Sequence, residues 1–530
     1  MMTHGRRALF GAIVGVAVLG LAGCGDDDDD GGGQAAAVNP QQACDALAGQ
    51  SVGGAAISAA TLVAATATTP EHCRVAGRLP TKLNFEIRLP SNWNGKLHFG
   101  GGGGFNGAIP GPDANALSKG FANVSSDSGH AGNPASTPLN SPVFDASWAL
   151  NDPEALNNFA YLSTPTVMAA AREIVQRRYG QPATRAYFEG CSNGGREALM
   201  NAQRFPNLFD GIISRAPAYN FTGLVGGAFN RNQKAFAAPG GAFTAGKITA
   251  LSTAVLAACD TVAADGVRDG VVSNLQACSF NPASLRCPGG ADTGDTCLSD
   301  AQINAVNTWI SDTSVAGGVV ANRGWPLTGN ESDPGAWPTW VTGAPPSAPP
   351  NASLQFQFQD QFIKYMLAKN PAINSLAYSP DANAGAVQGV SAVIDAANPN
   401  LSLFNARGGK LILWHGANDS AISVNGTTQY YQQAVAAAGG QANANQFMRY
   451  YVAPGVNHCA GGPGADRADL LAALDAWVTS NAAPADLTAT RADAQGAATL
   501  ARPLCVWPRY PRYNGSGDVN AVGSYTCTAP

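Results

Sequence analysis

The amino-acid sequence predicts an α/β fold with a large insertion and several disulfide bonds. A strand-forming segment, a serine between two glycines and a helical segment follow one another around Ser192. Two later apolar segments are typical of buried strands and end in loops that contain Asp419 and His458. The chain has 530 residues and eleven cysteines, so it is too long for one simple core and rich in potential cross-links.

The charge of the chain argues against nucleic acid as its partner. The formal net charge is -5, only 13% of the residues are charged, and no basic stripe with interleaved aromatic residues occurs. Such a stripe is the usual signature of a protein that binds phosphate backbones. We therefore expect a small-molecule partner and no nucleic acid.

The N-terminus has the features of an export signal. A basic segment, MMTHGRR, precedes the apolar stretch ALFGAIVGVAVLG, which is too short to span a bilayer comfortably. Cys24 closes the tetrapeptide LAGC, which resembles a bacterial lipoprotein signal, and an ordinary secretory signal with a chance cysteine is the alternative. We predict a signal peptide over 1–23, lipidation of Cys24 and a flexible acidic tether over 24–40. The protein is then exported, either held by its lipid at the bacterial outer membrane or periplasm, or secreted.

The cysteine count agrees with export. Eleven cysteines less Cys24 leave ten, an even number suited to five disulfides in an oxidising compartment. No two cysteines have the Cys-x-x-Cys spacing that is typical of zinc sites.

Gly190, Ser192 and Gly194 form a Gly-x-Ser-x-Gly motif. The segment TRAYFEG before it predicts a strand, and GREALMNAQRFP after it predicts a helix that ends near Pro206. A serine hydroxyl is a weak nucleophile, and flanking glycines permit the tight strand-to-helix turn that projects it toward a base. Because the motif is common in glycine-rich proteins, a plain turn is the alternative for this segment alone.

Asp419 and His458 supply the partners that such a serine needs. Ser, then Asp, then His, each after a strand, is the chain order of α/β-hydrolases, and it predicts an α/β-hydrolase core. In this interpretation His458 takes the serine proton, while Asp419 holds the imidazole tautomer and stabilises the imidazolium. His415 is the rival base because it neighbours the same loop. We interpret it instead as a partly buried histidine that packs at a strand end.

Cys191 and Cys459 stand next to the two reacting residues. If Ser192 and His458 lie within hydrogen-bond reach, their neighbours lie within the few ångströms that a disulfide needs between its Cα atoms. We therefore predict a Cys191–Cys459 disulfide that joins nucleophile to base, with two unrelated buried thiols as the alternative.

These motifs resemble the tannase and feruloyl esterase family of α/β-hydrolases, which also includes hydrolases of mono(2-hydroxyethyl) terephthalate. The resemblance covers nearly all of the mature chain and is carried by GCSNGGREAL, HGANDSAIS, GVNHCAGG, LHFGGGGGFNG, SSDSGHAG, FDASWALNDPEALNNFAY and CDTVAADGVRDGVV. It implies five disulfides, namely Cys44–Cys73, Cys191–Cys459, Cys259–Cys278, Cys287–Cys297 and Cys505–Cys527.

The segment KLHFGGGGGFNG predicts a strand followed by a glycine loop. Backbone N–H groups of such a loop can point at the oxyanion that develops during ester cleavage. Gly104 and Asn193 are the expected donors, and Gly103 is a further candidate. The loop also matches the Gly-x-Gly-x-x-Gly pattern of dinucleotide sites, but AIPGPDAN interrupts the helix that should receive the pyrophosphate.

A long insertion, 219–402, separates the two parts of the predicted core, 41–218 and 403–530. It holds four of the nine tryptophans, four cysteines and many prolines, which is enough material for a small core of its own. The resemblance implies a lid domain that covers the active site. One helical stripe in it favours packing over a substrate wall, and its members are Phe358, Phe362, Tyr365 and Met366.

The lid segment CDTVAADGVRDGVVSNLQAC predicts a calcium loop. Oxygen ligands suit Ca²⁺, and the candidates are the carboxylates or carbonyls of Asp260, Asp265, Val267, Asp269 and Val271. The loop lacks the ligand spacing of an EF-hand, and a solvated acidic turn is the alternative. Asp260 departs from the Asp-x-x-Asp-Gly pattern of the family because four residues separate it from Asp265. The resemblance favours structural calcium that orders the lid.

Together these features predict an exported serine carboxylic-ester hydrolase that works through an acyl-enzyme. The resemblance implies esters of aromatic acids, with feruloyl or other hydroxycinnamoyl, galloyl or related aryl groups, and a terephthalate monoester as the alternative. No arginine lies between Arg323 and Arg407 to pair with a substrate carboxylate, so we expect neutral or phenolic acyl groups to be preferred. Two other interpretations are a lipoprotein that binds aryl compounds without cleaving them and a peptidase with the same catalytic residues.

Overall fold

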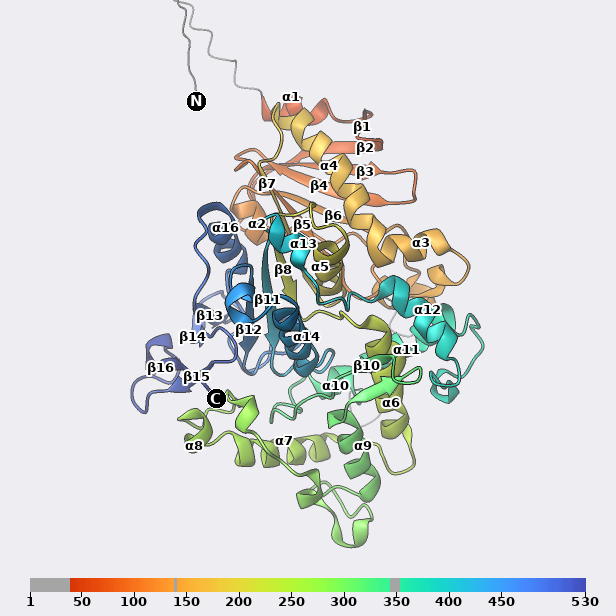
Figure 1. The fold of residues 1–530 in the computed structure, drawn as a ribbon, viewed down its shortest axis with the longest axis vertical. Coiled ribbons are helices and arrows are strands. Elements are labelled where there is room, and N and C mark those ends of the chain that lie inside the picture. The colour runs from red at the N-terminus through yellow and green to blue at the C-terminus, as the bar shows by residue number, and fades with distance from the viewer. Residues whose placement is uncertain (1–38, 138–140, 344–352) are drawn as a thin grey trace, which may run out of the picture. The chain divides into compact units, whose positions relative to one another are not determined.

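A computed structural model describes residues 39–137, 141–343 and 353–530 (Figure 1). The predicted signal peptide, Cys24 and nearly all of the tether lie outside the described residues. Within these ranges, none of the helices combines the length and apolar character that a bilayer crossing requires.

A ten-stranded mixed sheet runs through the structure in the order β1-β2-β3-β4-β6-β5-β7-β8-β11-β12 (Figure 1). Its antiparallel part contains β1 (Ser51–Val52), β2 (Ala55–Val63), β3 (His72–Arg78) and β4 (Asn84–Pro90). Its parallel part contains β5 (Lys96–Gly100), β6 (Ala122–Ser126), β7 (Arg185–Cys191), β8 (Gly211–Arg215), β11 (Lys410–Gly416) and β12 (Met448–Ala453). Because parallel strands end at one edge, the loops after β5, β7, β11 and β12 gather there.

Alternating side chains of the strands bury both faces of the parallel part. Leu411 and Leu413 belong to one apolar cluster, whereas Ile412 and Trp414 belong to another. The first face is covered by α4 (Ser163–Tyr179), α5 (Asn193–Arg204) and α14 (Val424–Ala437), and the second by α2 (Ala114–Ser118) and α16 (Leu470–Ser480). The shorter helices of this part are α1 (Pro40–Asp45), α3 (Pro153–Asn157), α13 (Ser402–Ala406) and α15 (Gln441–Ala444).

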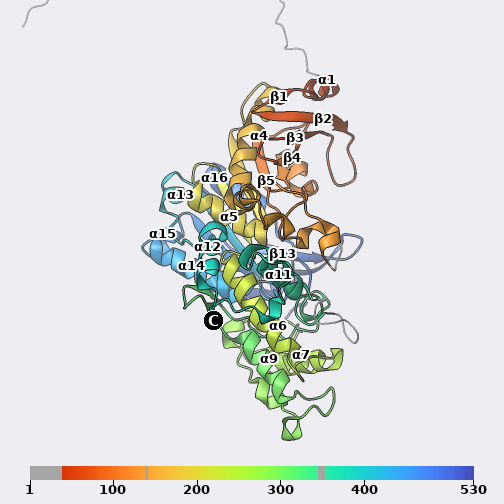
Figure 2. The same cartoon turned by 90° about the vertical axis from the view of Figure 1, so that its right-hand side faces the viewer.

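The long segment between β8 and β11 is mainly helical. It contains α6 (Asn230–Ala237), α7 (Ala245–Cys259), α8 (Val262–Asp265), α9 (Asp300–Ile310), α10 (Trp337–Trp340), α11 (Leu354–Phe362), α12 (Ala384–Ile394) and the hairpin of β9 (Thr313–Val315) and β10 (Val320–Asn322). In Figures 1 and 2, α7 and α9 lie at the far end from β1 to β4. A third apolar cluster joins Trp309 and Trp337 of this segment to Phe105 and Phe159. Residues Pro40–Pro530 cluster as one unit, and the lid boundaries 219–402 stay a prediction.

Two antiparallel hairpins follow α16 near the C-terminus. The first pairs β13 (Leu487–Ala492) with β14 (Ala498–Leu504), and the second pairs β15 (Tyr510–Tyr513) with β16 (Tyr525–Thr528).

The disulfides confirm the predicted pairing. The Cα atoms are 5.6, 6.0, 4.8, 4.9 and 5.6 Å apart in Cys44–Cys73, Cys191–Cys459, Cys259–Cys278, Cys287–Cys297 and Cys505–Cys527. These separations are normal for disulfides.

Candidate active site

Ser192 occupies the sharp turn between β7 and α5. Its backbone has φ 64° and ψ -120°, a region that non-glycine residues adopt only where the surrounding structure imposes it. The flanking glycines make room for the turn: a Cβ atom on Gly190 would lie 2.5 Å from the carbonyl carbon of Gly194. The Ser192 N–H donates to the Arg215 carbonyl on β8 at 3.1 Å, which fixes the turn against the neighbouring strand. The serine therefore stands at the carboxyl edge of the sheet, where a nucleophile of this fold belongs.

Asp419 and His458 meet at the same edge. His458 Nδ1 donates to Asp419 Oδ2 at 2.8 Å, and the other carboxylate oxygen accepts from the N–H groups of Ala421 and Ile422, both at 2.8 Å. Burial alone would raise the pKa of Asp419, but His458 and His415 hold it well below its usual range. Asp419 is thus an ionised anchor for His458, whose Nε2 remains available for a proton from the substrate side.

A disulfide ties this pair to the serine. Cys191 and Cys459, bonded with their Cα atoms 6.0 Å apart, are the direct neighbours of Ser192 and His458. Among the described residues, no hydrogen bond joins the Ser192 hydroxyl to His458. Such catalytic hydrogen bonds are often long in free enzymes and tighten when substrate binds. The structure therefore gathers the three predicted residues, and their catalytic roles are taken up as a proposal below.

His415 is more deeply buried than the sequence suggests. It is fully buried rather than partly buried, its Nδ1 lies 2.8 Å from the Thr427 hydroxyl, and its Nε2 lies 3.0 Å from the Ile422 carbonyl. The same Nε2 is 3.1 Å from Asp419 Oδ2. With both ring nitrogens engaged, His415 supports Asp419 and has no free nitrogen for a substrate.

The glycine loop after β5 contains two backbone N–H groups that make no hydrogen bond among the described residues. Gly101 N–H donates to the Glu189 carbonyl at 2.9 Å, and Phe105 N–H donates to the Val143 carbonyl at 3.0 Å. Within the described chain, the N–H groups of Gly103 and Gly104 have no acceptor. Gly104 has φ 55°, and a Cβ atom there would collide with the Val143 carbonyl, so only glycine fits.

A small cavity lies between Ser192 and the helical insertion. Gly104 and Asn193 line it beside the serine, and none of its lining residues carries a charge. Its apolar wall from the insertion consists of Phe221, Leu224, Val225, Phe229, Trp340 and Phe358. Phe358, Phe362 and Met366 of the helical stripe are buried in one apolar cluster, as the packing interpretation expects, and Phe358 also lines this cavity.

Comparison with known proteins identifies the chain. A model of the family described as tannase and feruloyl esterase matches residues 66–528. The protein belongs to the tannase and feruloyl esterase family. It is therefore a carboxylic ester hydrolase with the α/β-hydrolase fold, as the resemblance implies, and not a non-catalytic binding protein.

Individual members of the tannase and feruloyl esterase family match over most of their length. The chain is 34% identical to a mono(2-hydroxyethyl) terephthalate hydrolase from Piscinibacter sakaiensis, over 89% of this chain and 87% of that protein. It is 28% identical to feruloyl esterase B from Aspergillus niger, over 91% of each. The crystal structure of feruloyl esterase B from Aspergillus oryzae superposes with a TM-score of 0.78 at 25% identity, covering 92% of this chain and 100% of the other.

The predicted calcium loop contains two carboxylates that are suited to a cation. Asp260 is buried, and its Oδ1 has no hydrogen-bond partner within the described residues. Asp265 accepts from the N–H groups of Asn274 at 2.8 Å and Ser273 at 3.1 Å. Burial raises the pKa of Asp265 to about 6. Both residues would gain from a bound positive charge.

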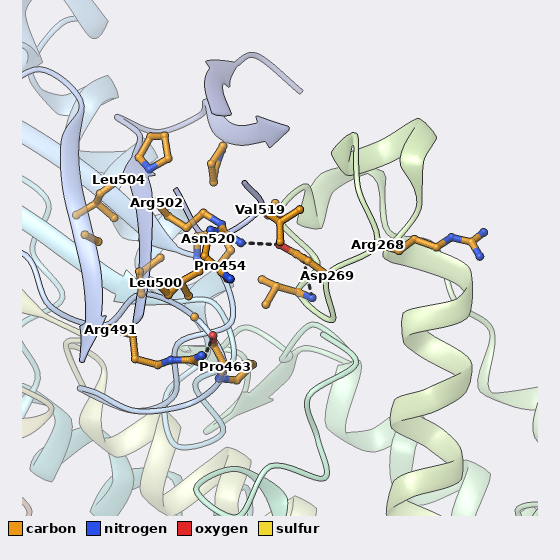
Figure 3. Close-up of a pocket in the computed structure, with 18 residues that line it drawn as sticks. Arg268, Asp269, Pro454, Pro463, Arg491, Leu500, Arg502, Leu504, Val519 and Asn520 are labelled. Atoms are coloured by element: carbon orange, nitrogen blue, oxygen red, sulfur yellow. Dashed lines mark hydrogen bonds and ion pairs between the residues drawn. The ribbon is translucent and has the colours of Figure 1, made fainter. Parts of the chain in front are cut away.

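Asp269 fits the predicted ligand set less well. Its Oδ2 forms an ion pair with Arg502 of β14 at 2.8 Å, and Figure 3 shows Asp269 directed toward this partner while Arg268 points away. These side chains border a separate cavity of about 300 Å³ (Figure 3). Among the described residues, one group of three His, Cys, Asp or Glu side chains is spaced closely enough to hold a metal ion. It consists of His98, Asp113 and Glu189, whose ligand atoms lie within 4.8 Å of one another. The three aspartates of the loop are therefore not drawn together around one point.

Two polar residues beside the serine were not predicted from the sequence. Glu197 accepts from the Gly102 N–H at 3.1 Å, and Asn106 accepts from the Asn193 side chain at 3.1 Å. The available signal was the spacing of Asn193 and Glu197, because residues four apart share one face of a helix.

Proposed function

We propose that this family member is an exported serine esterase that cleaves esters of aromatic acids. The observation that carries the proposal is the Asp419–His458 hydrogen bond, joined through the Cys191–Cys459 disulfide to a serine in a strained turn. This arrangement matches the division of labour between nucleophile, base and orienting carboxylate in acyl transfer.

The proposed reaction proceeds in two acyl-transfer steps. Ser192 Oγ attacks the ester carbonyl while its proton passes to His458 Nε2, and the oxyanion receives N–H groups of Gly104, Asn193 and Gly103. His458 then returns the proton to the departing alcohol, which leaves an acyl-enzyme. A water molecule repeats the sequence, with His458 as its base, and the carboxylic acid is released.

The cavity beside Ser192 supports an aromatic acyl group without a ring carboxylate. Its apolar and aromatic wall suits contact with a ring, for which the cavity of about 20 Å³ has to open, whereas a buried carboxylate needs a fixed cation. The nearby lid cations are engaged elsewhere: Lys364 pairs with Asp360 at 2.8 Å, and Lys369 donates to the Ala149 carbonyl at 2.8 Å. The terephthalate monoester named in one relative is the second candidate substrate.

Substrate preference tests this assignment. We expect kcat/KM for methyl ferulate or methyl gallate to exceed that for mono(2-hydroxyethyl) terephthalate by at least about 10-fold, because burying an unpaired charge costs about 1–3 kcal/mol or more. The matched control is the same terephthalate ester with its free carboxylate methylated, which should restore turnover. Preference for the free carboxylate would contradict the proposal, and faster cleavage of the corresponding anilides would favour a peptidase.

We also propose that calcium binds the loop through Asp260 and Asp265, with the carbonyls of Val267 and Val271 as further ligands. Asp269 completes the set when it exchanges Arg502 for the ion. The buried, unpartnered Asp260 Oδ1 supports the proposal most directly. The ion would supply charge that orders the loop and would take no part in ester cleavage.

Chelation is expected to lower the melting temperature, and added Ca²⁺ should restore it. A ligand at 100 times its Kd stabilises the folded state by about 2.7 kcal/mol. Asp265→Asn should remove the response, while Asp381→Asn, an exposed aspartate outside the loop, should keep it. Calorimetry measures the melting temperature and elemental analysis measures the metal content. A wild-type protein that contains no metal and whose melting temperature does not change with chelator would contradict the proposal.

Five disulfides support the exported state, because such bonds persist mainly in oxidising compartments. Processing before Cys24 and its lipidation are part of the same proposal. Mass spectrometry of the mature N-terminus tests both, and an intact, unlipidated Met1 would refute them.

A further inference from the structure

Glu197 is a buried carboxylate that faces the glycine loop from helix α5. Its Oε2 accepts from the Gly102 N–H at 3.1 Å, and its Oε1 accepts from the side-chain amides of Asn106 at 3.2 Å and Asn193 at 3.1 Å. Only 5% of the residue is exposed. Since all three partners are N–H donors, the arrangement requires an acceptor on both oxygens and suits the ionised carboxylate.

A second layer of contacts fixes the partners of Glu197. Arg196, which is fully buried, donates through Nε to the Asn193 side-chain oxygen at 2.7 Å. The same guanidinium donates to the carbonyls of Ala160 at 2.6 Å and Phe159 at 2.8 Å. Asn193 is therefore held from two sides, and Arg196 also balances the negative charge next to it.

We propose that Glu197 is a positioning residue that aims the oxyanion hole. The inference rests on the proposed serine-esterase function and names the group that holds its donors in place. Glu197 accepts from the N–H of Gly102 and so anchors the loop directly before Gly103 and Gly104, of which Gly104 lines the cavity beside Ser192. Its second oxygen fixes Asn193, whose backbone N–H is the third donor. One carboxylate thus aligns donors from two separate elements.

The alignment matters because an oxyanion hole acts through donors that are already in place. Donors stabilise the transition state most when they need no reorganisation during the reaction, and losing one costs about 10²–10³ in turnover. Among the described residues, the backbone of Gly103 and Gly104 makes one hydrogen bond, in which the Gly103 carbonyl accepts from the Asn106 N–H at 2.8 Å, and neither N–H group is held. Anchoring the preceding glycine to a buried charge supplies that rigidity.

The test is Glu197→Gln, which keeps the size and removes the charge. Its NH₂ group must face one of the three donors, so the glycine loop or Asn193 shifts. We expect kcat to fall about 100-fold, with little change in KM, because the lost interaction is made in the transition state. An arylboronic acid, which forms a tetrahedral adduct with the serine, should bind about 100-fold more weakly to the variant. Inhibition by the product acid should stay unchanged.

Asp395→Asn is the matched control. Asp395 is a half-buried carboxylate near Arg196 and accepts from the Thr222 N–H at 2.8 Å, but none of its hydrogen bonds reaches the glycine loop. This variant should lose melting temperature and keep the boronate affinity. If Glu197→Gln does not fold, Asn106→Gly, which tolerates the positive φ of 49° and removes one donor, should show a smaller loss in the same direction.

The outcomes separate the two proposals. Wild-type protein that binds the boronate and Glu197→Gln protein that binds it equally tightly would overturn the positioning role and leave the esterase mechanism standing. Wild-type protein that does not bind the boronate would overturn the serine mechanism and the positioning role together. Parallel losses in kcat and boronate affinity, with product inhibition unchanged, would establish the role of Glu197.

Discussion

Replacement of Ser192 by alanine is expected to lower aryl-ester turnover by a factor on the order of 10⁴–10⁶, with little change in melting temperature. The alanine lacks the oxygen that forms the acyl-enzyme, and the fold does not depend on that hydroxyl because it makes no hydrogen bond within the described residues. His458→Ala should have a similar effect, since the serine then has no base. Initial rates with a chromogenic aryl ester measure both.

The double variant Ser192→Ala/His458→Ala distinguishes a catalytic unit from independent contributions. Residues that act together give non-additive losses, so the double variant should be about as slow as either single one. His415→Gln is the comparison for the rival histidine and should lose less turnover than His458→Ala. Covalent labelling by a fluorophosphonate, mapped by mass spectrometry, should modify Ser192 in the wild-type protein. Turnover that survives Ser192→Ala at the wild-type rate would refute the mechanism.

Removal of the Cys191–Cys459 disulfide by a double replacement with serine is expected to lower both stability and kcat. The bond closes a sequence separation of 268 residues. Chain entropy assigns about 4–5 kcal/mol to loops this long. The Cys191–Cys459 bond also fixes the nucleophile relative to the base, and small displacements of reacting groups lower the rate strongly.

The Cys287–Cys297 disulfide provides the matched control. It closes a separation of only ten residues within the insertion and has no triad residue beside it. Its removal should cost less stability and leave kcat nearly unchanged. Calorimetry and steady-state kinetics on the two variants measure the difference. Equal effects on kcat would show that the Cys191–Cys459 bond has no special role in aligning the site.

Local patterns were sufficient to predict the fold and the gathering of the three proposed catalytic residues at one edge of the sheet. Ser192, Asp419 and His458 each follow an apolar strand, and parallel strands of one sheet end at one edge, so chain order alone predicts that they meet. The pairing of Cys191 with Cys459 followed from the same geometry.

Contacts between distant segments could not be predicted in this way. Glu197 reaches Gly102 across a separation of 95 residues, and Asp269 reaches Arg502 across 233. Neither pair has a repeating pattern or a motif, because each depends on the packing of a helix or hairpin against a loop. The burial of His415 was underestimated for a related reason: its environment is built by Thr427 on α14, which is not evident from the strand that carries the histidine.

Strands β8 and β11 are neighbours in the sheet, although the whole helical insertion lies between them in the sequence. The polypeptide leaves the sheet at one strand and re-enters it at the next, so the ends of the helical segment are neighbours whatever its length. Loop-closure entropy grows only slowly with length, so such a segment can lengthen, shorten or be exchanged at small cost to the sheet. The six apolar residues that wall the cavity from the insertion all belong to this exchangeable stretch, whereas Ser192, Asp419 and His458 lie outside it. Under the proposed function, recombination confined to one interval of the gene would therefore change the residues that contact the acyl group and leave Ser192, Asp419 and His458 unchanged.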